Sequence, residues 1–146
     1  RPYLSENRAR LMIGPQANGA RYPSGAPVTL ALRQEAGAPA GDRYATVFNL
    51  ASDGTVQMLY PEPSDGSGKL APGQSLPILD SQVIAPFGAD HVVALVTRSA
   101  PDQFRTLLRT VEGQRAAARL VAPIKALLAG EGGTGALSIG ELYTGN

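Results

Sequence analysis

The clearest pattern of apolar and polar positions lies between Tyr44 and Pro61, where two runs rich in β-branched, aromatic and aliphatic residues flank the pair Asp53 and Gly54. A tight reversal between antiparallel strands needs positive φ at its centre, which Asp tolerates and Gly adopts freely. Pro61 and Pro63 follow the second run, and proline cannot donate a hydrogen bond to a strand ladder. The pattern therefore predicts a β-hairpin with Asp53 and Gly54 at its tip.

Strand patterns recur on both sides of this hairpin. Apolar and polar positions alternate at residues 28–33, and partly at residues 9–13, which predicts two strands with one buried face each. The run from His91 to Thr97 is apolar at both parities. Such a run is typical of a strand covered on both faces, so we expect it at the centre of the structure.

Two shorter segments and one final segment complete the predicted strands. Residues 76–79 and 82–84 are short apolar candidates, and the alternation at residues 137–143 predicts a final strand that returns to the sheet. Between them and the hairpin, the segment from Glu62 to Gly73 carries Pro, Ser, Asp and Gly with almost no large apolar residue. We expect this segment to be an exposed loop and the most mobile one.

The apolar spacing changes to that of a helix after the predicted central strand. Ser99, Pro101 and Asp102 match a capping box, with a hydroxyl for a free amide, an acid three residues on and a proline in the first turn. The helix that this pattern starts has one apolar face, formed by Phe104, Leu107, Leu108 and Val111, before Gly113 interrupts it.

A second helix is predicted from Gln114 to Ala129. Pro123 should kink or split it, because proline removes an amide donor and crowds the preceding turn. Its apolar stripe consists of Ala117, Leu120, Val121, Ile124, Leu127 and Leu128, with Arg115, Arg119 and Lys125 toward solvent. We expect this stripe to pack on the core of the domain.

Composition agrees with a β-rich globular chain. Of the 146 residues 43% are hydrophobic and 17% charged, and 17 Gly and 12 Pro are spread along the sequence, which suits short elements joined by turns. The length suits one domain, residues 1–146. The predicted fold class is therefore mainly β with two helices in the C-terminal half, arranged as a single-domain antiparallel β-sandwich.

Charge and cysteine content exclude several classes of function. The net charge is +1 without a basic block, so nucleic acid is not an expected partner, and the absence of cysteine excludes disulfides and thiolate metal sites. No run approaches the roughly 20 apolar residues that span a bilayer, so we expect no membrane insertion. The chain begins at Arg1 without an initiator Met or a leader, and we expect an excised or processed soluble piece.

No motif predicts a catalytic, cofactor-binding or metal-binding residue. His91 is the only histidine, and its neighbour Asp90 should point to the opposite face of the strand, where it cannot orient the ring as a triad acid does. The segment from Asp65 to Lys69 superficially resembles a phosphate-binding loop, but Leu70 stands where Ser or Thr is needed. The acidic residues lack the every-second-residue spacing of a calcium loop.

Taken in order, several weak motifs resemble a known bacterial domain of unknown function. They are Tyr22, Gly25, Val28 and Leu30, the run Tyr44 to Pro61 with its triplet Leu59, Tyr60 and Pro61, Leu70 and Gly73 with Leu76 to Ile78, and Phe87 to Pro101. The resemblance covers residues 8–104 and implies a compact β-sandwich, with residues 105–146 as a helical extension plus a final strand. In that family the domain is commonly appended to caspase-like peptidases, protein kinases and cell-envelope proteins, and it brings no catalytic residues. Glu62, where the family often has Asn, and Arg43, in place of the usual Gly, depart from its pattern.

The resemblance and the missing motifs favour a non-catalytic accessory or interaction domain of a larger bacterial signalling, peptidase-associated or cell-envelope protein. Its partner would be a protein or an adjacent domain of the same polypeptide, without a cofactor. Binding is expected at the polar loop, through Glu62, Asp65, Ser67 and Lys69, or along a sheet edge. The expected compartment is the periplasm or cell envelope, with the cytoplasm as the alternative.

Two other hypotheses stay open at this point. One is a small hydrolase with a site near His91 and the loop from Glu62 to Gly73. The other is a structural component of the envelope or of a secretion system.

Overall fold

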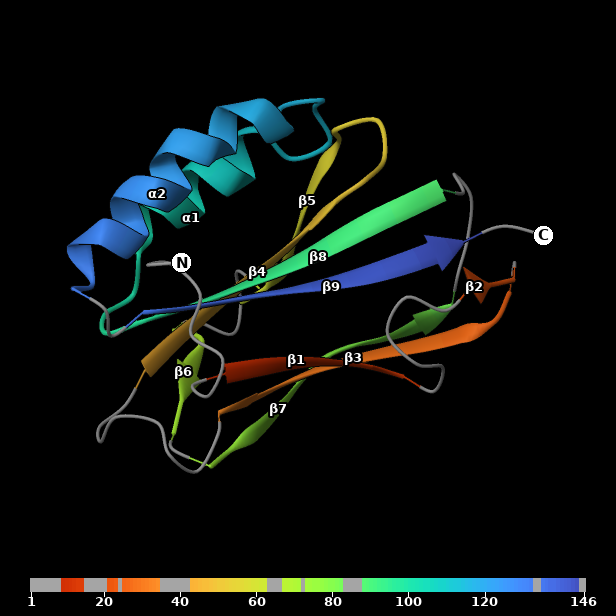
Figure 1. The fold of residues 1–146 in the computed structure, drawn as a ribbon, viewed down its shortest axis with the longest axis horizontal. Coiled ribbons are helices and arrows are strands. Elements are labelled where there is room, and N and C mark those ends of the chain that lie inside the picture. Colours follow the sequence, from red (N-terminus) through yellow and green to blue (C-terminus); the bar gives the residue numbers. More distant parts are fainter. Residues whose placement is uncertain are drawn as a thin grey trace.

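The computed structural model describes residues 9–14, 21–23, 25–34, 43–62, 67–71, 73–82, 88–132 and 135–144. The predicted fold class is confirmed in that the chain is mainly β with two α-helices in its C-terminal half (Figure 1). The strands are β1 (Ala9–Gly14), β2 (Arg21–Tyr22), β3 (Pro27–Gln34), β4 (Arg43–Leu50), β5 (Val56–Tyr60), β6 (Lys69–Leu70), β7 (Ser75–Gln82), β8 (Gly88–Thr97) and β9 (Ala136–Thr144). The helices are α1 (Asp102–Thr110), the 3-10 turn η1 (Ala117–Leu120) and α2 (Val121–Gly130).

The strands form two sheets. The smaller sheet has the order β1-β3-β7, and the larger has the order β2-β9-β8-β4-β5, with β6 paired to the start of β4. Pairing is antiparallel, as predicted, except between β2 and β9, which run parallel. The short candidate at residues 76–79 lies inside β7, while Val83 and Ile84 lie outside the described residues.

The central position predicted for the apolar run from His91 to Thr97 is confirmed. Strand β8 pairs with β4 on one side and with β9 on the other, and every residue from Val92 to Val96 is buried. One face of the larger sheet shares an apolar cluster with the smaller sheet, and the other face shares a cluster with the helices (Figure 1). Both parities of β8 are apolar because both faces of this strand are covered.

The predicted hairpin is formed by β4 and β5. The amide of Gly54 donates to the carbonyl of Ala51 at 2.9 Å, and the amide of Thr55 donates to Oδ1 of Asp53 at 2.9 Å. Gly54 has φ of +88°, and no described residue other than glycine has positive φ. The left-handed conformation at the tip therefore belongs to Gly54 alone, while Asp53 contributes a side-chain acceptor.

The free side of β5 is covered by the segment after α1. The amide of Gly113 donates to the carbonyl of Val56 at 2.8 Å, the amide of Val56 donates to the carbonyl of Gln114 at 3.0 Å, and Oε1 of Glu112 accepts from the amide of Met58 at 2.8 Å. A helix start at Gln114 was therefore the wrong prediction, because this segment adds to the sheet edge and leaves its backbone groups bonded to β5.

The helices differ from prediction at their beginnings. The capping box at Ser99 is wrong, since Pro101 is the N-cap of α1 and makes no side-chain capping hydrogen bond. The second helix is divided into η1 and α2, which places Pro123 in the first turn of α2, where a missing amide donor costs no intrahelical bond. Leu120 and Leu128 are buried as the predicted stripe requires, but Val121 is exposed.

The segment from Glu62 to Gly73 is not wholly an exposed loop. Leu70 of β6 is fully buried, and the carbonyl of Gly68 accepts from the amide of Ala45 at 2.8 Å. A Cβ at Gly68, whose φ is +69°, would lie 2.7 Å from the carbonyl oxygen of Ala45 and 2.8 Å from Nη2 of Arg105. Lys69 and Leu70 of this segment are therefore part of the sheet.

Arg105 holds α1 against this part of the sheet. Its side chain is buried, with Nε donating to Oγ1 of Thr46 at 3.0 Å and Nη2 donating to the carbonyl of Ala45 at 2.8 Å. Burial lowers the pKa of the guanidinium from its ordinary value, while the nearby charge of Asp102 acts in the opposite direction. A buried charge is tolerated when its hydrogen bonds are made, which fixes where α1 packs.

Candidate functional site

Three polar side chains meet on the helix side of the larger sheet, where β8 and β9 run side by side. His91 pairs in register with Glu141, and its Nε2 lies 3.8 Å from Oε1 of Glu141, with both side chains about half exposed. The hydroxyl of Tyr143 donates to Oε2 of Glu141 at 2.9 Å. This hydrogen bond raises the pKa of the Tyr143 hydroxyl, because it favours the protonated form.

Asp90 does not belong to this group. Strand alternation puts Asp90 on the face of Val92, which packs toward the smaller sheet, and puts His91 on the helix side with Val93. The carboxylate of Asp90 accepts from Nδ2 of Asn49 at 3.4 Å, and burial raises the pKa of this carboxyl. Asp90 and His91 therefore lie on opposite faces of β8, as the alternation of strand residues predicted.

An ion pair between Asp53 and Arg115 lies at the tip of the hairpin formed by β4 and β5. Nε of Arg115 lies 3.5 Å from Oδ2 of Asp53, and the hairpin tip follows Leu50, the residue of β4 that pairs in register with His91. Hydrogen bonds from Thr55 lower the pKa of the Asp53 carboxyl. Both groups are exposed, so their main effect is to tie the tip of the hairpin to the segment that covers β5.

The chemistry available near His91 is limited. Among the described residues the ring of His91 has the carboxylate of Glu141 beside it, and no hydroxyl of those residues forms a hydrogen bond with the ring. Within the described ranges, no group of three or more His, Cys, Asp or Glu side chains could hold a metal ion. Nor is any helix in those ranges long and apolar enough to cross a membrane.

The predicted loop residues lie at the other end of the larger sheet. Glu62, Ser67 and Lys69 are exposed, while Asp65 lies outside the described residues. Lys69 pairs in register with Tyr44 at the start of β4, whereas His91 pairs with the last residue of that strand. At about 3.3 Å per residue this separates them by roughly 20 Å. The part of the predicted loop that has a register in the sheet, Lys69 and Leu70, therefore lies far from His91, contrary to what the hydrolase hypothesis needs.

Strand β9 has one side that lacks a paired strand over most of its length among the described residues, and the sequence pattern does not predict this. It pairs with β8 along its whole length, but on its other side β2 pairs only with Tyr143 and Thr144. Along Ala136–Leu142 no described strand pairs with that side, which we call the β9 edge. Ile139, at the middle of this stretch, is 51% exposed. Alternation predicted the strand but could not say which side of it lacks a neighbour.

The inner face of β9 is held against β1. The amide of Leu11 donates to Oγ of Ser138 at 3.1 Å, and a Cβ on Gly140 would lie 2.6 Å from Cδ1 of Ile13. Glycine at position 140 thus permits a close approach of β1. With this face packed, the β9 edge and the side chains on the helix side are what the strand can offer to another molecule.

No protein-family model matches the chain, and no curated protein matches it. The resemblance to the bacterial domain of unknown function therefore stays a prediction.

Proposed function

We propose that this chain is a non-catalytic interaction domain that binds a protein partner by adding one of the partner's strands to the β9 edge. The observation that carries the proposal is the difference between the two outer edges of the larger sheet, one along β5 and the other along β9. Strand β5 has its free side covered by the segment from Glu112 to Arg115, with backbone and side-chain hydrogen bonds. The β9 edge has no such cover among the described residues.

An unpaired sheet edge is a template for another strand, and proteins commonly block such edges unless they use them. Strand addition takes its affinity from main-chain hydrogen bonds and its specificity from alternate side chains. Here the alternate side chains on the helix side are those of Ile139, Glu141 and Tyr143, an exposed apolar residue followed by a polar pair. The β9 edge therefore combines an exposed apolar residue, Ile139, with backbone groups to which no described strand is paired.

The family resemblance supports a second part of the proposal, which is that the domain serves as an accessory part of a larger bacterial signalling, peptidase-associated or cell-envelope protein in the periplasm or envelope. The exposed residues Glu62, Ser67 and Lys69 remain the alternative binding surface. Lys69 belongs to β6, which pairs with β4, and β8 lies between β4 and β9, so the contribution of this surface is separable from that of the β9 edge.

A peptide selection tests this proposal. A displayed library of extended random peptides is selected on the sparsely immobilised wild-type chain and then measured on variants. Ile139→Lys should abolish binding, because it places a charge beside the added strand. Met12→Lys is the matched control, since Met12 is a strand residue 46% exposed on the other sheet.

The outcome for the loop variants separates the two surfaces. Glu62→Ala and Lys69→Ala should leave binding unchanged. Peptides that bind equally well to Ile139→Lys, but not to these loop variants, would move the interaction to the loop and refute the β9 edge. Turnover in a broad hydrolase screen that His91→Ala removes would refute the non-catalytic assignment.

A further inference from the structure

The β9 edge has a centre that matches an antiparallel pair with itself. The unpaired stretch is bounded by the start of the strand at Ala136 and by β2 at Tyr143, and Ile139 is its midpoint. In an antiparallel pair about a twofold axis, the residue on the axis meets its own copy. Only an axis at Ile139 lets the whole unpaired stretch form a ladder, with Ala136 opposite Leu142 of the other chain.

This register buries the exposed apolar residue of the strand. Directly opposed side chains in an antiparallel pair have Cβ atoms about 4.5–5.5 Å apart. Ile139 of each chain would thus pack on Ile139 of the other and remove both from water. Ile139 is exposed at the middle of the β9 edge, and Ile139 of a second chain would cover it with an apolar side chain of the same size.

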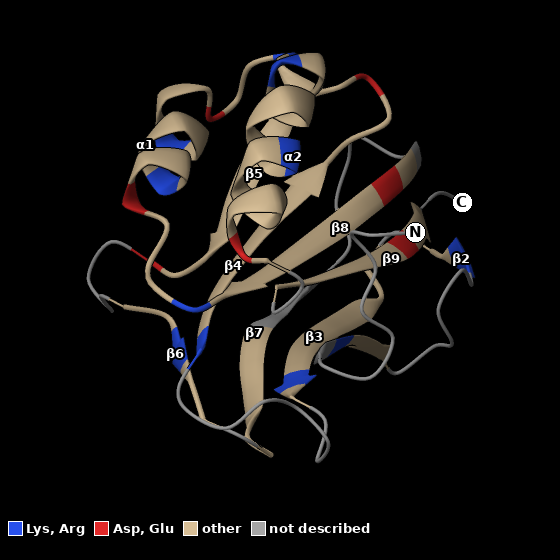
Figure 2. Ribbon diagram, turned by 60° about the vertical axis from the view of Figure 1, so that its left-hand side comes forward, with Lys and Arg blue, Asp and Glu red and all other residues tan. Residues whose placement is uncertain are grey.

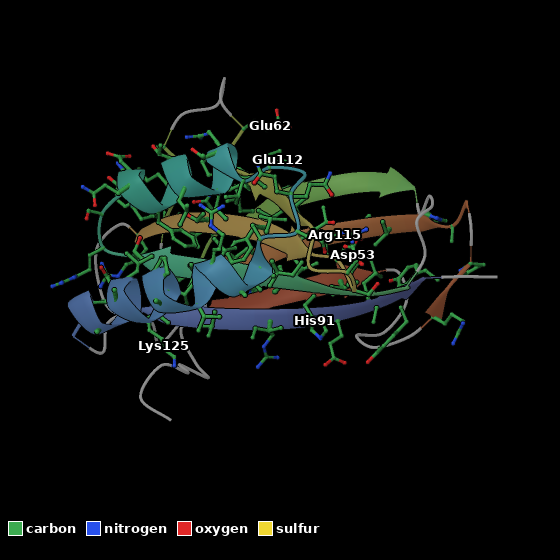
Figure 3. All side chains as sticks on the ribbon, turned by 90° about the horizontal axis from the view of Figure 1, so that it is seen from above. Asp53, Glu62, His91, Glu112, Arg115 and Lys125 are labelled. Carbon is green, nitrogen blue, oxygen red and sulfur yellow. The ribbon has the colours of Figure 1, made fainter. Side chains whose placement is uncertain are left out.

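The same register brings opposite charges together. It places Glu141 of one chain beside Leu137 of the other, on the helix side of the sheet. Ile124 and Leu128 of α2 belong to one apolar cluster with Leu137, so α2, which carries Lys125, covers this face of the sheet near the start of β9. In Figure 3 Lys125 reaches past β9 on the side away from β8, and it forms no ion pair with a described residue.

We infer that the protein partner at the β9 edge is a second copy of this chain, joined as an antiparallel β9 pair about a twofold axis at Ile139, with Lys125 of each chain facing Glu141 of the other. The inference rests on the proposed function, and it names the partner. The twofold axis stands perpendicular to the joined sheet, so both α2 helices lie on one face. The exposed side of α2 carries Ala122, Ala126 and Ala129, whose small side chains leave room for the second chain.

Cysteine cross-linking tests the register, and the chain is suited to it because it contains no cysteine. Ile139→Cys should form an intermolecular disulfide in a glutathione buffer, since opposed strand residues fall within the Cα separation of about 4.4–6.8 Å that a disulfide needs. Met12→Cys, with similar exposure on the other sheet, should remain a monomeric thiol. Equal cross-linking of the two variants would overturn the inference.

Charge exchange tests the pairing of Lys125 with Glu141. In analytical ultracentrifugation the wild type should dimerise, and Lys125→Glu or Glu141→Lys alone should each weaken dimerisation about tenfold, because two ion pairs become two repulsions. An equimolar mixture of the two variants should form heterodimers of wild-type affinity, because each chain then carries the charges that complement the other. Homodimers of undiminished affinity, or a mixture that stays monomeric, would refute the register.

The failure of this inference can be told from failure of the proposed function. A wild type that stays monomeric at all attainable concentrations refutes the second copy as partner. If selected peptides still bind that monomer and lose binding in Ile139→Lys, strand addition at the β9 edge stands and its partner is another protein.

Discussion

The close approach of β1 to Gly140 offers a quantitative test of the fold. A Cβ at position 140 would lie 2.6 Å from Cδ1 of Ile13 and 3.1 Å from Cδ2 of Leu11. Favourable carbon contacts lie at about 3.5–4.0 Å, so Gly140→Ala forces the side chain of Ile13 to move. Overpacking of this kind costs about 1–3 kcal/mol. Removing the flexibility of a strand glycine offsets about 0.5–1 kcal/mol of that cost.

A second substitution removes the atom responsible for the clash. Ile13→Val deletes Cδ1, and alone it should cost about 0.5–1.5 kcal/mol, toward the lower end because Ile13 is only partly buried. In the double variant the new Cβ occupies the space of the deleted methyl. The double variant should therefore be more stable than the sum of the two single losses predicts, by about 1–2 kcal/mol.

Urea unfolding of the wild type, the two single variants and the double variant measures this coupling. The control pair is Ile13→Val with Gly130→Ala, because a Cβ at Gly130 meets nothing within 4 Å. Those two substitutions should be additive to within about 0.3–0.5 kcal/mol. Additivity in the Gly140 cycle as well, or a Gly140→Ala variant as stable as the wild type, would mean that β1 does not pack on β9 as described.

Three further predictions use the same assay. Gly68→Ala should cost about 3 kcal/mol or more, because the new Cβ meets backbone at a position with φ of +69°, whereas Gly73→Ala, with φ of +76° and open space, should lose only about 1–2 kcal/mol. Leu108→Ala should cost about 2–5 kcal/mol and Leu107→Ala clearly less, since only Leu108 is fully buried, and equal losses would contradict the packing of α1. Burial raises the pKa of the Asp90 carboxyl above 3.8, so the charged carboxylate opposes folding at neutral pH, and this penalty disappears once the carboxyl is protonated. Asp90→Asn should therefore stabilise the fold at neutral pH and lose that advantage below pH 3.8. A stabilisation that appears only at acid pH would contradict the assignment.

The sequence predicts those elements whose burial follows a simple period. The hairpin of β4 and β5, the central strand β8 and the buried face of α1 all have apolar residues at the spacing of the structure that they form. A local pattern gives the wrong prediction where the same residues at the same spacing occur both at a helix cap and in a turn that is not a cap. Ser99 precedes an acid at the capping spacing, yet its carbonyl accepts from the hydroxyl of Thr97 at 2.8 Å and Pro101 is the cap.

Other errors come from tertiary contacts that no local window contains. Gln114 has helical neighbours in sequence but hydrogen-bonds to β5, and Leu70 lies in a strand too short to show alternation. Arg105, which amphipathic spacing does not mark as buried, has its hydrogen-bond acceptors 59 and 60 residues away. The candidate site belongs to this class, because the alternation around Ile139 predicts a strand but the order of strands decides which one has an open side.

The order of strands in the larger sheet also constrains how the chain can fold during synthesis. Strand β8 is buried from Val92 to Val96, and its two neighbours β4 and β9 come before and after it in the chain, with both helices between β8 and β9. A ribosome-bound chain that ends before Ala136 would have β8 paired on one side only. Nascent chains with uncovered apolar strands are prone to aggregate and to recruit chaperones. The larger sheet is complete only when β9, the last of its strands to be synthesised, pairs with β8 on one side and with β2 on the other.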